Sequence, residues 1–414
     1  MFDPLKPYEA VVGGDVIRHL RQLAKPLGDL KIVHVNSTRA GGGVAEILHK
    51  LVPLKQALGL DVRWDVVEGT PDFFECTKSF HNGLQGIPVG LSSSHLQSYE
   101  EVNRANAERL RPLLEDADFV FIHDPQPAAM IQHFRRTRAK WIWRCHIDMS
   151  RPYRPVWKYL RPILAPYTAS VFSLAEFAQP LPHAQFLIPP SIDPLSEKNM
   201  ELPGEEVLEI FQRFDLDPQL PLLLQVSRFD RFKDPLGVIE AFRIVRRMTP
   251  AQLALVGGGA ADDPEGRAVL DEVRSAVEND RDIHVIDLPP DAHRTINAFQ
   301  RAADIVIQKS LREGFGLTVT EALWKGKPVI GGDVGGIRLQ VVNHHTGFLV
   351  RTPEGTALRL RYLLHHRGLM EKMGRRAREM VRENFLLTRH LREYLSLMHA
   401  LLHMTEDRIE LGAA

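Results

Sequence analysis

Cysteine, long apolar runs and an excess of charge of one sign are scarce or missing in this sequence. Only two of the 414 residues are cysteines, and Cys76 and Cys145 lie too far apart to indicate a disulfide scaffold or a cysteine-rich zinc site. No apolar run approaches the ~18 residues that a membrane-spanning helix requires. Basic and acidic side chains number 52 each, so the basic excess needed to coat nucleic acid is missing. Residues 1–10 lack the pattern of a signal peptide, so we expect a cytoplasmic protein with neither a membrane nor a nucleic-acid partner.

The order of the expected elements indicates an α/β protein with two doubly wound, Rossmann-like domains. At about 150 residues per domain, the length corresponds to two or three domains. Short apolar runs alternate with helical patterns, as in parallel sheets covered by helices on both faces. The strands predicted in the first half are 31–36, 62–68, 119–124, 141–148, 169–174 and 185–189, and those in the second half are 222–226, 252–256, 283–286, 304–308, 328–330 and 347–350.

A proline-rich segment, Pro189 to Pro194, separates the two series of strands and predicts a hinge. We therefore expect an N-terminal domain over 1–193, a C-terminal domain over 194–385 and a terminal segment, 386–414. That segment contains a helix, from Leu387 to about His403, that packs back on the N-terminal domain. The domains would face each other across a cleft lined by the carboxyl ends of their strands, where open parallel sheets bind ligands.

Three glycines, Gly41 to Gly43, follow the first predicted strand and precede a helix. Glycines at such a turn let the backbone approach a ligand and aim amide groups at an anion. The spacing differs from the dinucleotide-binding pattern G-x-G-x-x-G. A tight turn without a ligand explains the same residues, and both interpretations stay open.

Two cations, Arg228 and Lys233, follow the first strand of the second half. Together they suit a diphosphate, with the arginine supplying a planar fork and the lysine a mobile point charge. The alternative is a solvated loop in which these cations pair with Asp230 and Asp234. On either interpretation we expect both cations at a solvated edge.

The string from Lys309 to Ala322 places a glycine loop between a strand and a helix that begins around Thr318. The backbone of Gly314 to Leu317 offers amide groups to a phosphate. Glu313 and Glu321 could accept hydrogen bonds from hydroxyls at the two ends of one ligand. Alternatively, Glu321 only complements the helix dipole.

Together these motifs resemble the retaining nucleotide-sugar glycosyltransferases related to glycogen synthase and sucrose synthase, over nearly the whole chain. The resemblance implies a GT-B fold, in which two Rossmann-like domains face each other across a deep cleft. Further strings look like those of the trehalose-forming members of this family: 80–86, 123–128, 143–148 and 189–194.

The resemblance also implies roles for individual residues. The N-terminal domain would bind the acceptor and the C-terminal domain the nucleotide-sugar donor. Arg228 and Lys233 would neutralise the donor diphosphate, Glu313 would hold hydroxyls of the transferred glucose, and His146 would contact that sugar. Donor-binding roles fall to Gly42, Gly43, Gly314, Phe315, Gly316, Leu317 and, at the ribose, Glu321. Acceptor-binding roles fall to Asp124, His81 and Asn82.

The implied reaction makes trehalose reversibly from a nucleoside-diphosphate glucose, such as UDP-glucose, and free glucose, with retention of the anomeric configuration. Alternatives are a retaining trehalose phosphorylase that uses glucose 1-phosphate and a regulator that binds sugar nucleotides without turnover. We expect a homodimer and no tightly bound cofactor, with Mg²⁺ acting, if at all, through the nucleotide diphosphate. No motif indicates an obligatory metal site, and Asp262-Asp263 is more typical of a helix start.

Overall fold

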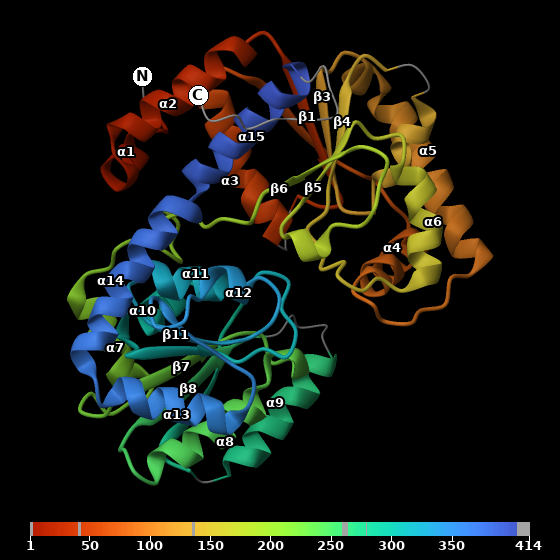
Figure 1. Ribbon diagram of the computed structural model, residues 1–414. Coiled ribbons are helices and arrows are strands. Elements are labelled where there is room, and N and C mark those ends of the chain that lie inside the picture. The colour runs from red at the N-terminus through yellow and green to blue at the C-terminus, as the bar shows by residue number, and fades with distance from the viewer. Residues whose placement is uncertain (1–2, 40–42, 135–136, 259–263, 279, 404–414) are drawn as a thin grey trace. The chain divides into compact units, whose positions relative to one another are not determined.

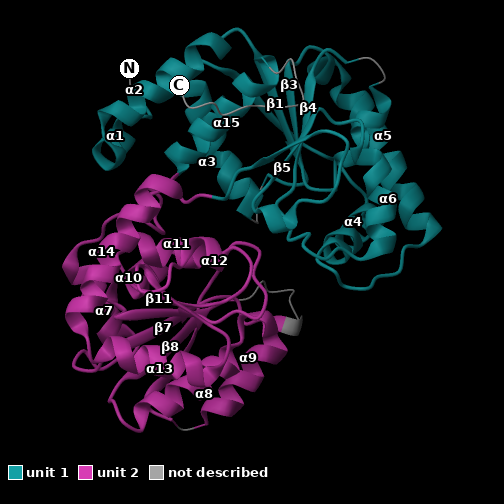
Figure 2. Cartoon of the chain, in the orientation of Figure 1, with its two compact units in different colours: residues 1–190, 387–414 teal, residues 191–386 magenta. Residues whose placement is uncertain are grey.

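The computed structural model describes residues 3–39, 43–134, 137–258, 264–278 and 280–403. The chain divides into two compact units, which Figure 2 shows in different colours. The first unit contains residues 1–190 and 387–414, and the second contains residues 191–386. The last helix therefore belongs to the same unit as the N-terminal half of the chain.

A parallel sheet forms the centre of the first unit (Figure 1). Its strands within the described residues are β1 (Lys31–Asn36), β2 (Asp61–Val66), β3 (Phe119–His123), β4 (Lys140–Arg144), β5 (Ala169–Phe172) and β6 (Ala184–Leu187). They lie in the order β2-β1-β3-β4-β5-β6, and every neighbouring pair is parallel. The order reverses direction between β1 and β3, and ligands of open α/β sheets bind outside the carboxyl ends of strands at such a point.

Helices cover both faces of this sheet because successive side chains of its strands point to opposite faces. Val33 and Val35 pack toward α4, α5 and α6, whereas Ile32 packs toward α1, α2, α3 and α15. The described helices of the unit are α1 (Lys6–Val12), α2 (Gly14–Ala24), η1 (Lys25–Leu27), α3 (Gly43–Ala57), α4 (Pro71–Leu84), α5 (Ser93–Glu115), η2 (Ala128–His133), α6 (Arg154–Leu164), η3 (Ala175–Phe177) and α15 (Leu387–His403).

The second unit is built on a second parallel sheet. Its described strands are β7 (Leu222–Val226), β8 (Gln252–Gly257), β9 (Ile283–Asp287), β10 (Ile305–Gln308), β11 (Val329–Gly332) and β12 (Gly347–Val350). Their order is β12-β11-β10-β7-β8-β9. This is the order of dinucleotide-binding folds, and it reverses direction between β7 and β10.

Helices also cover both faces of the second sheet, with α8, α9 and α13 packing on one of them (Figure 1). Several helices begin where a side chain accepts a hydrogen bond from the first turn, as Asp234 does from Gly237 N at 3.2 Å. The described helices are α7 (Gly204–Arg213), η4 (Arg231–Lys233), α8 (Pro235–Arg246), α9 (Pro264–Val277), α10 (His293–Ala302), α11 (Leu317–Trp324), α12 (Ile337–Gln340), α13 (Pro353–Leu364) and α14 (Arg367–Asn384).

The prediction of two doubly wound α/β sheets is confirmed, and each of the predicted strands is present. The largest difference in a boundary is at β4, which ends at Arg144 and does not continue to Asp148. The chain turns away after Cys145 because the next amide, that of His146, donates to the Asp124 side chain at 2.7 Å. Among the described residues, none of the helices is both long and apolar enough to cross a bilayer.

Candidate active site

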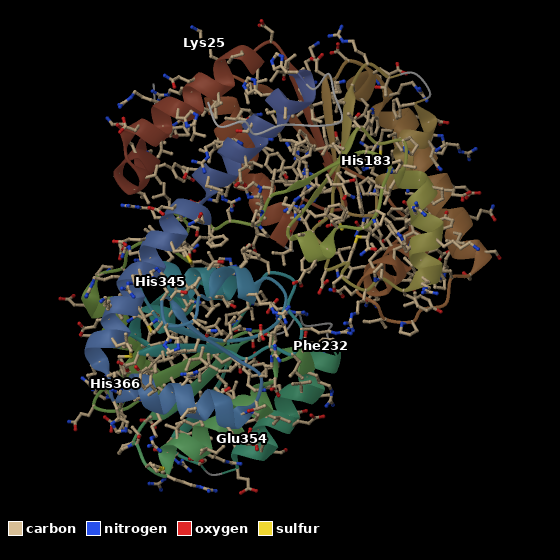
Figure 3. The ribbon with its side chains drawn as sticks, viewed as in Figure 1. Lys25, His183, Phe232, His345, Glu354 and His366 are labelled. Atoms are coloured by element: carbon tan, nitrogen blue, oxygen red, sulfur yellow. The ribbon has the colours of Figure 1, made fainter. Side chains whose placement is uncertain are left out.

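Two loops meet at the switch point of the second unit, one following β7 and the other following β10. Leu311 N donates to Phe232 O at 2.7 Å, and Gln225 Nε2 donates to Lys233 O at 2.8 Å. Figure 3 labels Phe232, whose ring is exposed. The Arg312 guanidinium lies beside this ring, with its Cζ 5.5 Å from the ring centre. The pairing of β7 with β10 thus joins the two predicted donor-site motifs.

An ion pair between Lys233 and Glu313 connects these loops. Lys233 Nζ donates to Glu313 Oε2 at 2.6 Å, and Ser310 Oγ donates to the same oxygen at 3.2 Å. The two side chains are only 18% and 9% exposed. Removing one partner would leave the other charge poorly solvated, so this pair differs from an ordinary surface salt bridge.

Arg228 has a different environment from Lys233. Its side chain is 63% exposed and lies 3.3 Å from the Asp230 carboxylate. The expectation of a solvated edge is therefore correct for Arg228 and wrong for Lys233. Lys233 does not pair with Asp234, because that carboxylate binds Lys309 and caps α8.

The glycine loop before α11 is supported by close backbone contacts. Gly316 has φ of 81° and forms the N-cap of the helix, a conformation that favours glycine. A Cβ on Gly335 would lie 1.8 Å from Glu313 O, and one on Gly336 would lie 2.5 Å from Phe315 Cα. These contacts hold the segment from Gly314 to Leu317 at the start of α11. Val319 N donates to Gly316 O at 2.9 Å, so the amides of Leu317 and Thr318 are the first-turn amides available to a ligand.

Glu321 is buried on α11, with 6% of its surface exposed. It is not in the first turn of the helix, so the interpretation as a charge that only complements the dipole loses its support. Lys325 Nζ donates to Glu321 O at 3.3 Å and to Asn199 Oδ1 at 3.1 Å. Burial lowers the pKa of Lys325 to about 7, although the charge of Glu321 opposes this shift.

Asp124 occupies the switch point of the first unit, directly after β3. Its φ of 62° is unusual for a residue other than glycine, and such strained residues cluster at functional sites. Its Oδ1 accepts from His146 N, while its carbonyl accepts from Trp143 Nε1 at 3.0 Å. Burial raises the pKa of Asp124 to about 6, although the His146 amide and the Arg144 charge oppose this effect.

His146 lies beside Asp124 and stacks on His123, with ring centres 5.4 Å apart. His123 Nδ1 and His146 Nε2 are 3.1 Å apart. Burial, followed by the charge of Arg144, lowers the pKa of both histidines, that of His123 to about 3. Both rings are therefore neutral at physiological pH.

The weaker acceptor candidates, His81 and Asn82, lie in the last turn of α4. Tyr153 N donates to Gly83 O at 2.7 Å, which attaches this turn to the loop that follows His146. Within the described chain, no hydrogen bond joins His81 or Asn82 to Asp124 or His146.

The glycine triplet of the first unit is only partly described. Gly41 and Gly42 lie outside the described residues, as do Asp262 and Asp263. Gly43 begins α3 and is exposed, and an added Cβ there would meet nothing within 4 Å.

The sequence did not reveal Lys55, His34 and His123, which are buried and in contact one after another, the last of them with His146. The only signal was the appearance of polar residues inside apolar runs. It also missed Gly335 and Gly336, which follow β11 as a glycine pair. Over the described ranges, no three histidine, cysteine or acidic side chains are grouped as metal ligands would be.

Comparisons with known proteins agree with this arrangement. The family model for the trehalose synthase N-terminal domain matches residues 34–179, and that for group 1 glycosyl transferases matches residues 207–380. Trehalose synthase of Thermococcus litoralis is 46% identical over 401 residues, covering 96% of this chain and 97% of that protein. The Rubrobacter xylanophilus trehalose synthase is 44% identical over 406 residues, which cover 96% of this chain and 97% of that protein.

More distant proteins share part of the sequence or only the fold. Trehalose phosphorylase of Pleurotus pulmonarius is 29% identical over 420 residues, which cover 86% of this chain and 55% of that protein. Sucrose-phosphate synthase from Thermosynechococcus elongatus superposes with a TM-score of 0.68 at 18% identity, covering 90% of this chain and 99% of that one. Trehalose-6-phosphate synthase OtsA superposes with a TM-score of 0.71 at 12% identity, covering 91% of this chain and 99% of that one.

Two doubly wound units with polar loops at the carboxyl ends of their strands define a glycosyltransferase of the GT-B class. Within that class, the chain belongs to the trehalose synthase family. It is an enzyme of trehalose-related glycosyl transfer.

The burial of the Lys233–Glu313 pair predicts different stabilities for two variants. Lys233→Met should lower the free energy of unfolding by about 1–3 kcal/mol, because Glu313 is then left without its cation. Arg228→Met, its matched control, should change it by less than about 0.5 kcal/mol because that side chain is exposed. Calorimetry checks both values, and Lys233→Met/Glu313→Gln should recover most of the loss. Equal unfolding temperatures for the two single variants would contradict this assignment.

Proposed function

We propose that the protein is a retaining glucosyltransferase that makes trehalose, reversibly, from a nucleoside-diphosphate glucose and free glucose. The observation that carries the proposal is the Lys233–Glu313 pair beside the glycine loop of α11, at the switch point of the second unit. The proposal is further supported by the identity of 46% to a trehalose synthase.

On the donor side, negative charge develops on the departing nucleoside diphosphate. Arg228, Lys233 and the first-turn amides of α11 would stabilise that charge more strongly in the transition state than in the ground state. Glu313 would accept hydrogen bonds from hydroxyls of the transferred glucose through the oxygen that Lys233 does not occupy. Its pairing with Lys233 would thus fix the sugar relative to the phosphate.

In the bond-changing step, the bond between the anomeric carbon and the phosphate oxygen breaks, and a bond to the acceptor hydroxyl oxygen forms on the same face. The acceptor proton passes to the departing phosphate oxygen. A retaining glycosidase would instead require two carboxyl groups about 5 Å apart, as acid and nucleophile. A cationic loop suits an anionic leaving group better.

On the acceptor side, the proposal assigns glucose binding to the first unit. Asp124 would accept a hydrogen bond from an acceptor hydroxyl, and His146 would contact the transferred sugar. His81 and Asn82 stay weaker candidates. Four predictions from the sequence stay as they are: donor binding by Gly42 and Gly43, an action of Mg²⁺ through the diphosphate, a homodimer, and a cytoplasmic location.

A retaining trehalose phosphorylase is the second candidate, supported by the identity of 29% to such an enzyme. It would use the same cations for the phosphate of glucose 1-phosphate. A ribose contact at Glu321 would serve a nucleotide sugar only. A regulator without turnover is the third candidate.

Product analysis separates these candidates. The wild-type enzyme with glucose and UDP-, ADP- or GDP-glucose should release trehalose and the nucleoside diphosphate. In a parallel incubation, glucose 1-phosphate replaces the nucleotide sugar, and we expect little trehalose. Trehalose formed chiefly from glucose 1-phosphate would favour the phosphorylase, and no trehalose in any arm would favour the regulator.

Glu321→Gln tests the ribose contact while preserving the shape of this buried side chain. Losing a charged acceptor costs about 1.5–3 kcal/mol, so affinity for UDP or ADP should fall by roughly one to two powers of ten. Isothermal titration calorimetry measures this change. Glu354→Gln is the control, because Glu354 lies exposed on α13 (Figure 3). Unchanged nucleotide affinity in Glu321→Gln would refute the ribose role.

The raised pKa of Asp124 predicts a pH dependence on the acceptor side. Above about 6 the group is a carboxylate that accepts from glucose, and below about 6 it takes up a proton. The KM for glucose should therefore rise as the pH falls through about 6, while the KM for the nucleotide sugar changes less. Initial rates over a pH series provide the measurement. Asp124→Asn should lack this inflection, and an inflection that persists in the variant would assign it to another group.

A further inference from the structure

A continuous line of hydrogen bonds between nitrogen atoms runs through the first unit from α3 to the residues that follow β4. Lys55 Nζ lies 2.9 Å from His34 Nε2, and His34 Nδ1 lies 3.0 Å from His123 Nε2. His123 Nδ1 in turn lies 3.1 Å from His146 Nε2. Both nitrogens of the two middle rings meet another nitrogen, so flipping either ring would replace these contacts with contacts to carbon. The ring orientations are thus fixed by one another.

Each ring in the line carries a single proton. Lys55 and His34 are completely buried, and His123 is 3% exposed. Burial is the main cause that lowers the pKa of all three histidines, that of His123 to about 3 and those of His34 and His146 well below the usual value. A neutral imidazole has one donor and one acceptor nitrogen. If one nitrogen in the line is known to be a donor or an acceptor, the role of every other nitrogen in the line follows.

The groups that surround Lys55 leave His34 as its hydrogen-bond acceptor. The Phe121 and Tyr394 rings, from β3 and α15, have centres 5.0 Å and 4.6 Å from Nζ. His123 and His390 are close enough for the Lys55 charge to lower their pKa values. In the described part of the chain, no carboxylate forms an ion pair with Lys55. Burial lowers the pKa of Lys55 to about 7, so it is an ammonium group below that pH.

An ammonium group donates hydrogen bonds and cannot accept them. His34 Nε2 must then accept, which puts the proton of His34 on Nδ1, where it is donated to His123 Nε2. The same constraint puts the proton of His123 on Nδ1, where it is donated to His146 Nε2. The proton of His146 is left on Nδ1, an atom that makes no hydrogen bond to any described residue.

We propose that Lys55 is a positioning residue that acts through His34 and His123 to hold the proton of His146 on Nδ1. His146 then offers a hydrogen-bond donor to a hydroxyl oxygen of the transferred sugar. This last step rests on the proposed function, whereas the direction of the hydrogen bonds does not. The nitrogen of a histidine that carries the proton is set by the hydrogen bond that the other nitrogen makes.

Nitrogen NMR tests the direction of the line without reference to activity. Protein labelled with ¹⁵N in its histidines, at a pH below the pKa of Lys55, should show His146 protonated on Nδ1. The variant His146→Gln identifies the signal by its loss. Lys55→Met removes the donor but keeps an unbranched side chain, and should convert His146 into a mixture of tautomers. Lys50→Met, at an exposed lysine of the same helix, should leave the signal unchanged.

Kinetics then test whether the tautomer matters for transfer. Lys55→Met should lower kcat by about ten-fold, the lower end of the range for residues that support the histidine ligands of metal sites. His34→Phe interrupts the line but can keep the stack on Phe121, whose ring lies 4.8 Å from that of His34. If Lys55 acts through His34, adding Lys55→Met to His34→Phe should cause no further loss.

Several outcomes would overturn the proposal. These are a proton on Nε2 of His146 in the wild type, an unchanged tautomer in Lys55→Met, or kinetic losses that add in the double variant. A purely structural role for Lys55 would lower the unfolding temperature and leave both tautomer and kcat as they are. Absence of glucosyl transfer in the wild type would refute the proposed function alone, because the NMR result still decides the role of Lys55.

Discussion

The parallel pairing of β7 with β10 places together two loops that are far apart in the sequence. Lys233 and Glu313 are 80 residues apart, yet their side chains form an ion pair at 2.6 Å because both loops leave the same edge of the sheet. Helix α11 begins at this edge too, so its amides lie close to the pair. In the first unit the neighbouring strands β1, β3 and β4 position His34, His123 and His146 in the same way. The candidate site depends on strand order more than on any local motif.

Most of the polar groups buried near these edges have a hydrogen-bond partner. An unsatisfied buried polar group costs about 1–3 kcal/mol, which is a large part of the stability of a domain. In the second unit the partners are opposite charges, Lys233 with Glu313 and Lys309 with Asp234. In the first unit the partners are mainly neutral histidine rings, each of which forms a hydrogen bond with the next. At these edges the second unit relies chiefly on ion pairs, whereas the first relies on neutral rings joined to the Lys55 ammonium.

The sequence predicts the sheets well because a strand buried on both faces must be a continuous apolar run. It also predicts the loops that follow β7 and β10, since glycine and charged residues interrupt those runs. It does not reveal which charges meet: Lys233 has Asp230 and Asp234 as neighbours in sequence but pairs with Glu313, a result of strand order. His34 and His123 were missed for a similar reason. His34 lies within the apolar stretch of β1 and His123 is the last residue of β3. They are 89 positions apart, and the pairing of β1 with β3 brings them together.

The contrast between the two units has a consequence for the proposed reaction. As the bond to the leaving phosphate breaks, the sugar gains positive charge and the phosphate gains negative charge. Cations near the phosphate stabilise this separation, whereas a cation against the sugar ring would oppose it. His146, the residue we assign to the sugar, is kept neutral by burial and by the positive charge of Arg144. A neutral ring can donate a hydrogen bond to a sugar hydroxyl without adding charge next to the anomeric carbon. The protein can thus keep Lys233 charged in one unit and His146 neutral in the other, as the charge development of the reaction requires.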